Sequence, residues 1–338
     1  MIMTVLRQQP RAAGLVLGLI AANLLAWCWA LQAFGDSGAL MAASLLAWGY
    51  GLRHAVDADH IAAIDNVTRK MMQQGRRPFA VGAWFSLGHS SIVVLASAAI
   101  AATATAFSTQ MSWLHDTGSV IGTAVSALFL LAMAFINLVI LRSVWRSFQA
   151  WKRGEKVSDD EIVSGGGMMS WLFGKTFRLI SRSWQMYLVG FLFGLGFDTA
   201  TEIGVLGISA AGASSGISVW SIMVFPALFA SGMALVDTLD NVLMVGAYGW
   251  AFSKPQRKLY YNMTITGTSV VVALFIGGLE ALGLLMDKFA LSGGIWRWVG
   301  ALNDNLGDAG FVVVGLFVAC WALSVLNYRW RGYDNLAR

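Results

Sequence analysis

The decisive stretch of the chain is ALMAASLLAWGYGLRHAVDADHIAAIDN, residues 39–66. It begins as an apolar run long enough to enter a membrane and then becomes densely polar. A charged side chain at the centre of a bilayer costs about 2.5–3.5 kcal/mol on insertion scales. Such a segment must be surrounded by protein, so we expect it at the centre of a helical bundle. Six ionisable residues occur within it: Arg53, His54, Asp57, Asp59, His60 and Asp65.

The composition indicates that the chain is a membrane protein. Of its 338 residues, 57% are hydrophobic and only 12% are charged, whereas soluble domains carry about 25% charged residues. Many of the 15 tryptophans lie near the ends of apolar stretches, as in an aromatic belt. The sequence therefore predicts an all-α integral membrane protein with the lipid bilayer as its surroundings, built as a single polytopic domain over residues 1–338.

The apolar stretches and the basic loops together predict the topology. Arg and Lys gather at the N-terminus, after the second, fourth and sixth stretches, and in the tail, whereas 107–117 and 213–218 contain none. This alternation predicts an even number of spans with both termini in the cytoplasm. A polar, Gly-rich segment predicts a flexible cytoplasmic loop at about 142–183. The eight expected helices are 12–34, 39–66, 79–106, 118–141, 184–212, 219–251, 263–286 and 309–328.

Two further features of the composition bound the function. The net charge of +5 comes from basic loops between spans, so we expect no nucleic-acid partner. The two cysteines, Cys28 and Cys320, both lie in apolar spans and form neither a CxxC pair nor a disulfide framework.

The spacing within 39–66 places imidazole and carboxylate groups on one face of a helix. At 100° per residue, His54, Asp57 and Asp65 fall within about 80° of one another. His60 continues that stripe from Asp57. Asp59 points to the opposite side, toward Arg53 or another helix.

Three other expected helices carry polar residues of the same kinds. His89 lies in 79–106, whereas the fourth histidine of the chain, His115, lies in an outward loop and is incidental. Imidazole and carboxylate ligands without thiolate suit Ni, Co, Zn, Mn or Fe and do not suit Cu(I). The same residue types also build proton relays, so the residues alone leave both readings open. The remaining acidic positions are Asp198 and Glu202 in 184–212 and Asp237 and Asp240 in 219–251.

Four motifs resemble the nickel/cobalt transporter family of bacterial and fungal permeases. They occur in order, each in a separate expected span, and extend over nearly the whole chain. Asn241 ends the last motif where Gly is commoner in the family. The motifs are RHAVDADHIAAIDN (53–66), FSLGHSSIVV (85–94), LGFDTATEIGVL (195–206) and FPALFASGMALVDTLDN (225–241).

The resemblance implies an eight-helix fold and high-affinity uptake of Ni²⁺ or Co²⁺ across the bacterial cytoplasmic (inner) membrane. It makes His54, Asp57, Asp59 and His60 the metal site. Val56 resembles the nickel-preferring members, which favours nickel. Further positions along the path or behind the ligands are Asn23, Asp65, His89, Asp198, Glu202, Asp237 and Asp240, and Asn23 faces the second helix from the first.

Several alternatives stand beside a nickel importer. A cobalt-preferring importer keeps the same site, and a related divalent-metal exporter shares the motifs, although the His-rich loop common in such exporters is absent from 142–183. HExxH and multiple-histidine boxes are also absent, so we expect no enzyme and no cofactor, only Ni²⁺ or Co²⁺ as the transported substrate. The sequence lacks GxxxxGK[ST], and the family carries no nucleotide-binding domain, so no ATPase subunit is expected.

A weak internal sequence similarity predicts a 3+3 inverted repeat. Residues 85–90, FSLGHS, resemble 229–234, FASGMA, and residues 57–61, DADHI, resemble 198–203, DTATEI, with one insertion. Helices two to four and five to seven run in opposite senses under this topology, so they form candidates for inverted repeats with the site between them.

Overall fold

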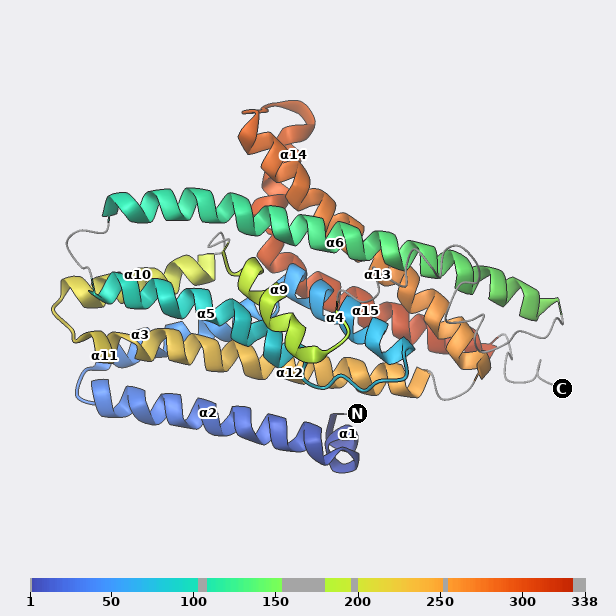
Figure 1. Ribbon diagram of the computed structural model, residues 1–338, viewed down its shortest axis with the longest axis horizontal. Coiled ribbons are helices and arrows are strands. Elements are labelled where there is room, and N and C mark those ends of the chain that lie inside the picture. Colours follow the sequence, from blue (N-terminus) through green and yellow to red (C-terminus); the bar gives the residue numbers. More distant parts are fainter. Residues whose placement is uncertain (1, 103–107, 154–179, 196–199, 252–254, 331–338) are drawn as a thin grey trace.

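The computed structural model describes residues 2–102, 108–153, 180–195, 200–251 and 255–330, and every element in these ranges is a helix. Most of the helices lie side by side along the long axis of the molecule (Figure 1). They are α1 (Ile2–Gln8), α2 (Pro10–Phe34), α3 (Gly38–His54), α4 (Ala58–Gln73), α5 (Val81–Ala102), α6 (Ser108–Lys152), η1 (Ser183–Gln185), α9 (Met186–Phe193), α10 (Ala200–Ser214), α11 (Val219–Ile222), α12 (Val224–Ala251), α13 (Pro255–Lys288), α14 (Gly294–Asp304) and α15 (Leu306–Trp330).

The length and apolar character of these helices define a membrane protein. Five described segments are long and apolar enough to cross a bilayer: Pro10–Phe34, Val81–Ala102, Val120–Ala150, Val219–Gly249 and Met263–Lys288. Their outward faces expose large apolar side chains such as Leu24, Leu25 and Leu128. Apolar surface of this extent is unstable in water and is satisfied by lipid.

The expected helix 39–66 is interrupted. α3 ends at His54, α4 begins at Ala58, and a turn of three residues separates them. Asp57 precedes α4 in an extended conformation (φ −66°, ψ 146°). Its carboxylate binds Arg53 and His54 on the preceding helix, and these two contacts stabilise the break. The expected stripe of His54, Asp57 and Asp65 on one helical face therefore does not form.

The expected helix 184–212 is also divided. η1 and α9 cover its first part and α10 its last part, with a turn at Gly194 after α9. The segment 196–199, which contains the predicted site residue Asp198, lies outside the described residues.

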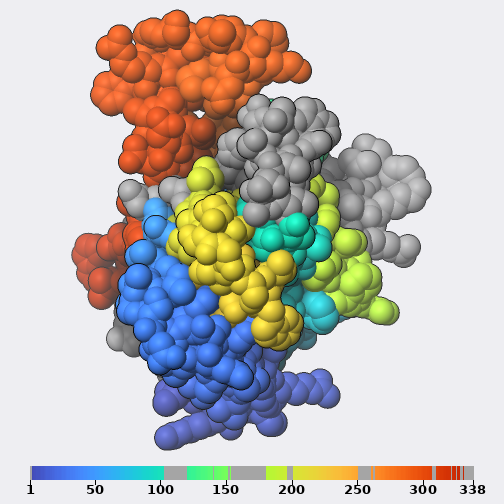
Figure 2. Space-filling model, turned by 90° about the vertical axis from the view of Figure 1, so that its left-hand side faces the viewer, coloured from blue at the N-terminus to red at the C-terminus, as the bar shows by residue number. Residues whose placement is uncertain are grey.

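Two other helices differ from the sequence prediction: α6 is longer than expected, and α14 is an extra helix. α6 extends to Lys152 and so makes the first part of the expected loop 142–183 helical, while 154–179 lies outside the described residues. α14 was not predicted. Viewed from the end where α2 and α3 are joined, the segment around α14 stands away from the body of the molecule (Figure 2).

Glycines allow the backbones of the central helices to approach each other closely. α5 packs against α9 and α12, and α12 also packs against α3. A Cβ atom at Gly88 of α5 would collide with the carbonyl oxygen of Tyr187, the second residue of α9, and one at Gly190 of α9 would collide with that of Phe85. Small residues permit this close approach in membrane helices, where packing and polar contacts replace the hydrophobic effect as the source of association. The backbone around the buried centre is therefore closely fixed.

Gly88→Ala should destabilise the protein, because the new methyl group meets backbone that no side-chain rotation can clear. The control is Gly18→Ala in α2, where no atom lies within 4 Å of the new Cβ and where the higher helix propensity of Ala stabilises by up to about 1 kcal/mol. Thermal unfolding of the two purified variants in detergent measures the difference. Equal melting temperatures would contradict the tight crossing of α5 and α9.

Candidate metal centre

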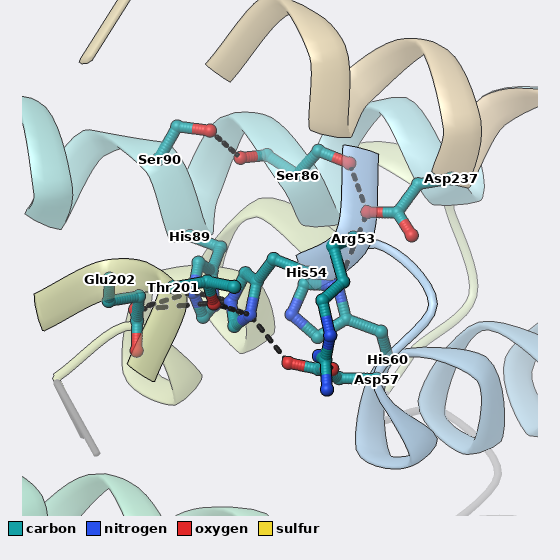
Figure 3. Close-up of polar contacts among 10 residues, drawn as sticks. All are labelled: Arg53, His54, Asp57, His60, Ser86, His89, Ser90, Thr201, Glu202 and Asp237. Atoms are coloured by element: carbon teal, nitrogen blue, oxygen red, sulfur yellow. Dashed lines mark hydrogen bonds and ion pairs between the residues drawn. The ribbon is translucent and has the colours of Figure 1, made fainter. Parts of the chain in front are cut away.

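Three histidines from three helices meet in the interior (Figure 3). His54 is the last residue of α3, His60 lies in the first turn of α4, and His89 lies in the middle of α5. One nitrogen from each ring lies within 4.8 Å of the others, which is close enough for all three to bind one metal ion. The three side chains are buried, none more than 3% exposed. The described residues thus contain a preformed cluster of imidazole ligands.

The break between α3 and α4 brings His54 and His60 together. In a continuous helix, residues six apart lie about 9 Å apart along the axis and about 120° apart around it. The turn brings the two side chains together instead, and their ring centroids are 4.6 Å apart. Either ring is about equally far from His89, at 4.8 Å.

Each imidazole contacts one buried carboxylate. Such a carboxylate fixes the tautomer and orientation of a metal-binding histidine and raises its basicity. Two of the three carboxylates come from other helices, so α10 and α12 help to position the rings. The pairs are His54 Nδ1 with Asp57 Oδ2 at 2.7 Å, His60 Nδ1 with Asp237 Oδ2 at 3.3 Å, and His89 Nε2 with Glu202 Oε1 at 2.8 Å.

The remaining ring nitrogens have the properties of metal ligands. His60 Nε2 and His89 Nδ1 are buried and make no hydrogen bond within the described part of the chain. Buried polar atoms in native proteins are nearly always hydrogen-bonded, and each exception requires an explanation such as an absent ion. His54 Nε2 lies 2.8 Å from His89 Nε2, the nitrogen that also contacts Glu202, so these two rings and this carboxylate meet at one point.

Hydroxyl groups and one arginine complete the centre. Ser86, one turn before His89, donates to Asp237 Oδ2 at 2.5 Å, and Thr201 Oγ1 lies 3.2 Å from His54 Nδ1. Arg53 donates to Asp57 Oδ1 at 2.6 Å. Three carboxylates thus surround the imidazoles, an excess of negative charge that favours a divalent cation.

The structure places the predicted residues in two groups. His54, Asp57, His60, His89, Glu202 and Asp237 meet in the centre, as the contacts above show. Asp59 is half-buried in the first turn of α4, and Asp240 is half-buried one turn beyond Asp237 in α12. Neither makes a hydrogen bond or ion pair to the three histidines within the described ranges.

Three further predicted residues lie around the centre rather than in it. Asp65 contacts Tyr248 and Ser269 farther along α4. Asn23 of α2 accepts a hydrogen bond from Trp48 of α3 at 2.9 Å, so it does face the second expected span. Val56 lies in the turn between α3 and α4, with its backbone against Gly310 of α15.

Sequence reasoning ranked His89, Glu202 and Asp237 behind the residues of 53–60, yet each contacts a ring of the centre. Ser86 and Thr201 were not predicted as site residues at all. The available signal was position: Ser86 lies three residues before His89 and Thr201 directly precedes Glu202. Spacing along one helix cannot show which residues of different helices meet.

The fold and the centre define a class of protein. The chain is an all-helical membrane protein whose interior holds a cluster of imidazoles and carboxylates suited to a divalent transition-metal ion. Ionisable residues buried among membrane-spanning helices commonly mark ion pathways, so this class is that of membrane transport proteins for metal ions.

Comparison with known proteins identifies the family. The chain belongs to the NicO family, described as high-affinity nickel-transport protein, which matches residues 40–327. It is 57% identical over 332 residues to a high-affinity nickel transport protein of Cupriavidus necator, covering 97% of this chain and 95% of that protein. It is 44% identical to the nickel transporter NicT of Mycobacterium tuberculosis (82% and 76% covered) and 35% identical to the cobalt transport protein NhlF of Rhodococcus rhodochrous (94% and 92% covered). No solved structure matches the chain.

Asp237→Asn should weaken binding of Ni²⁺ by about 10–100-fold, because the amide no longer holds the His60 ring as the carboxylate does. The matched control is Asp240→Asn, one turn away in α12, which should bind with near wild-type affinity. Equilibrium binding of Ni²⁺ to the purified proteins provides the measurement. Equal losses in the two variants would show that general negative charge, and not the His60 contact, governs binding.

Proposed function

We propose that the chain is a secondary permease, and not an enzyme, that imports Ni²⁺ across the cytoplasmic membrane of a bacterium through the centre of His54, His60 and His89. The observation that carries this proposal is the set of three buried imidazoles, each held by its own carboxylate. Membership of a nickel-transport family and the names of the relatives support it. The metal ion is the substrate, and a single chain without an ATPase subunit acts on it.

Nickel is favoured over cobalt on chemical grounds and on the relatives. Nitrogen and oxygen sites bind Ni²⁺ more strongly than Co²⁺ in the Irving–Williams order. The relatives named for nickel are more similar to the chain than the relative named for cobalt. Val56 forms part of the turn between His54 and Asp57, so its side chain can adjust their spacing and thereby selectivity. Asn23 of α2 accepts a hydrogen bond from Trp48 of α3 and so helps to position α3, which carries His54.

The proposed topology has eight spans, with α3–α4 and α9–α10 each counted as one interrupted span. α4, α6 and α12 end at the same end of the bundle, the end toward which α1 lies (Figure 1). The basic residues after α4 and along the last turns of α6 lie there too, which makes this end cytoplasmic under the positive-inside rule. Both termini are then cytoplasmic.

The close contacts between helices support the 3+3 inverted repeat. Each proposed repeat begins with an interrupted span, α3–α4 in the first and α9–α10 in the second. α3 packs against α12 of the second repeat, and α9 packs against α5 of the first. Glycine and aromatic positions correspond in these contacts, with the same spacing of three residues in each. The corresponding pairs are Gly51 with Phe229 and Gly190 with Phe85, Trp48 with Gly232 and Tyr187 with Gly88.

Two hydrogen-bonded pairs, one in each proposed repeat interface, also correspond to each other. Asn241 of α12 donates to Thr68 of α4 at 2.7 Å, and Ser209 of α10 donates to Ser97 of α5 at 3.4 Å. Interrupted helices at the midplane between inverted repeats are the usual location of ion sites in secondary transporters. Rocking of one repeat against the other would then open the centre alternately to each side.

The energetics of uptake need no ATP. An inside-negative potential of 100 mV contributes about 2.3 kcal/mol per charge, hence about 4.6 kcal/mol for a divalent ion. This energy supports an accumulation ratio of roughly 2,000.

Radioactive Ni²⁺ uptake by proteoliposomes containing the purified chain tests the proposal. Wild-type protein should accumulate Ni²⁺ saturably when valinomycin and a potassium gradient set the interior negative, with Co²⁺ competing weakly. His54→Ala should abolish uptake, whereas the matched control His115→Ala should transport normally.

The alternatives give different results in the same assay. Preferential uptake of Co²⁺ would assign a cobalt importer with the same centre. Faster loss of preloaded metal without uptake would assign an exporter. Uptake that does not respond to the potential would overturn the proposed driving force and leave the site intact.

A further inference from the structure

A second buried polar cluster lies on α4 beyond the metal centre. Arg69 is completely buried and Asp65 is 1% exposed, and Arg69 Nε lies 3.8 Å from Asp65 Oδ2. An arginine is almost never buried without a partner because the desolvation of its charge is unfavourable. Here the ion pair is long, and Nε makes no hydrogen bond within the described residues. The guanidinium is therefore held in the interior without being fully satisfied.

The cluster ties α4 to three other helices. Arg69 Nη1 donates to Thr266 Oγ1 of α13 at 3.0 Å, and Nη2 donates to Asn66 Oδ1 at 3.0 Å. Asp65 accepts hydrogen bonds from Ser269 Oγ of α13 at 2.6 Å and from the hydroxyl of Tyr248 of α12. Asn137 of α6 also donates to Asn66. These contacts close the space between α4, α6, α12 and α13.

The position of the cluster matters for transport. Asp65 lies five residues and Arg69 nine residues beyond His60, about 7.5 Å and about 13.5 Å farther along the axis of α4. α4 runs from the centre to the end of the bundle that carries the basic residues (Figure 1). Asp65 and Arg69 therefore lie between the histidines and that end of α4, and Asp65 is the nearer of the two along the helix axis.

The repeated architecture does not account for these charges. In the proposed inverted repeat, α10 corresponds to α4 on the outward side of the centre. From Ile203 to Ser214 that helix contains no charged residue. Between the described helices α4 and α10, only α4 carries a buried ion pair, which points to a role specific to the inward half of the path.

We propose that Arg69 closes the inner end of the pathway, and that Asp65, with the hydroxyls of Ser269 and Tyr248, receives the divalent ion when Arg69 moves away. This inference rests on the proposed function. In this structure the guanidinium occupies the place of a cation beside Asp65 and repels any metal from the cytoplasmic side. Oxygen ligands hold Ni²⁺ less firmly than imidazoles do, so the transfer from the histidines to Asp65 is a step toward release.

The test measures Ni²⁺ binding, uptake and leakage of preloaded Ni²⁺ in the same proteoliposome system. Arg69→Gln should retain binding at the histidines but leak about tenfold faster, since an open state that is normally a minor population is no longer disfavoured. Arg69→Lys, which keeps the charge, should leak less than Arg69→Gln. The matched control Arg77→Gln removes an exposed charge from the loop after α4 and should behave as wild type.

A double variant separates a gate from a purely structural ion pair. Asp65→Asn with Arg69→Gln removes both charges, so no uncompensated charge remains buried, and this variant carries the test if either single variant fails to fold. We expect it to bind Ni²⁺ but to leak and to take up Ni²⁺ slowly. Wild-type transport by the double variant, or unchanged leakage in Arg69→Gln, would overturn the proposal. If wild-type protein itself showed no uptake, the proposed function would fail instead.

Discussion

The contact between each buried imidazole and its own carboxylate is the constraint on which the rest of the structure depends. Six ionisable groups are withdrawn from water at this point, and such groups are tolerated in an interior only when they are paired. The pairing requires α3, α4, α5, α10 and α12 to meet around one small volume. The interruption between α3 and α4 places His54 at the end of one helix and His60 in the first turn of the next, so that both rings reach the same volume.

The surrounding architecture allows this convergence. Glycines at the crossings of α5 with α9 and of α3 with α12 let backbones approach until a single methyl group would collide. The three histidine side chains of the centre are buried, none more than 3% exposed. The charged cluster of Asp65 and Arg69 lies farther along α4, beyond the histidines.

Much of this arrangement could be predicted from the sequence, and the failures have identifiable causes. His54, Asp57 and His60 were predicted because charge density in an apolar span is costly and therefore informative. The break at residues 55–57 was not predicted, since no proline or glycine occurs there and the turn packs against a distant part of the chain, with the Val56 carbonyl against Gly310 of α15. Asp65 consequently does not share one helical face with His54 and Asp57, as the spacing predicts, and contacts Tyr248 and Ser269 instead. The roles of Glu202 and Asp237 depend on which helices pack together, and periodicity along one helix does not contain that information.

The most direct test of the central claim is X-ray absorption spectroscopy at the nickel K-edge on the purified chain loaded with one equivalent of Ni²⁺. The account predicts a first shell of nitrogen and oxygen only, with the multiple-scattering pattern of three imidazoles from His54, His60 and His89. A sulfur ligand, or a shell of oxygen atoms with no imidazole scattering, would contradict it.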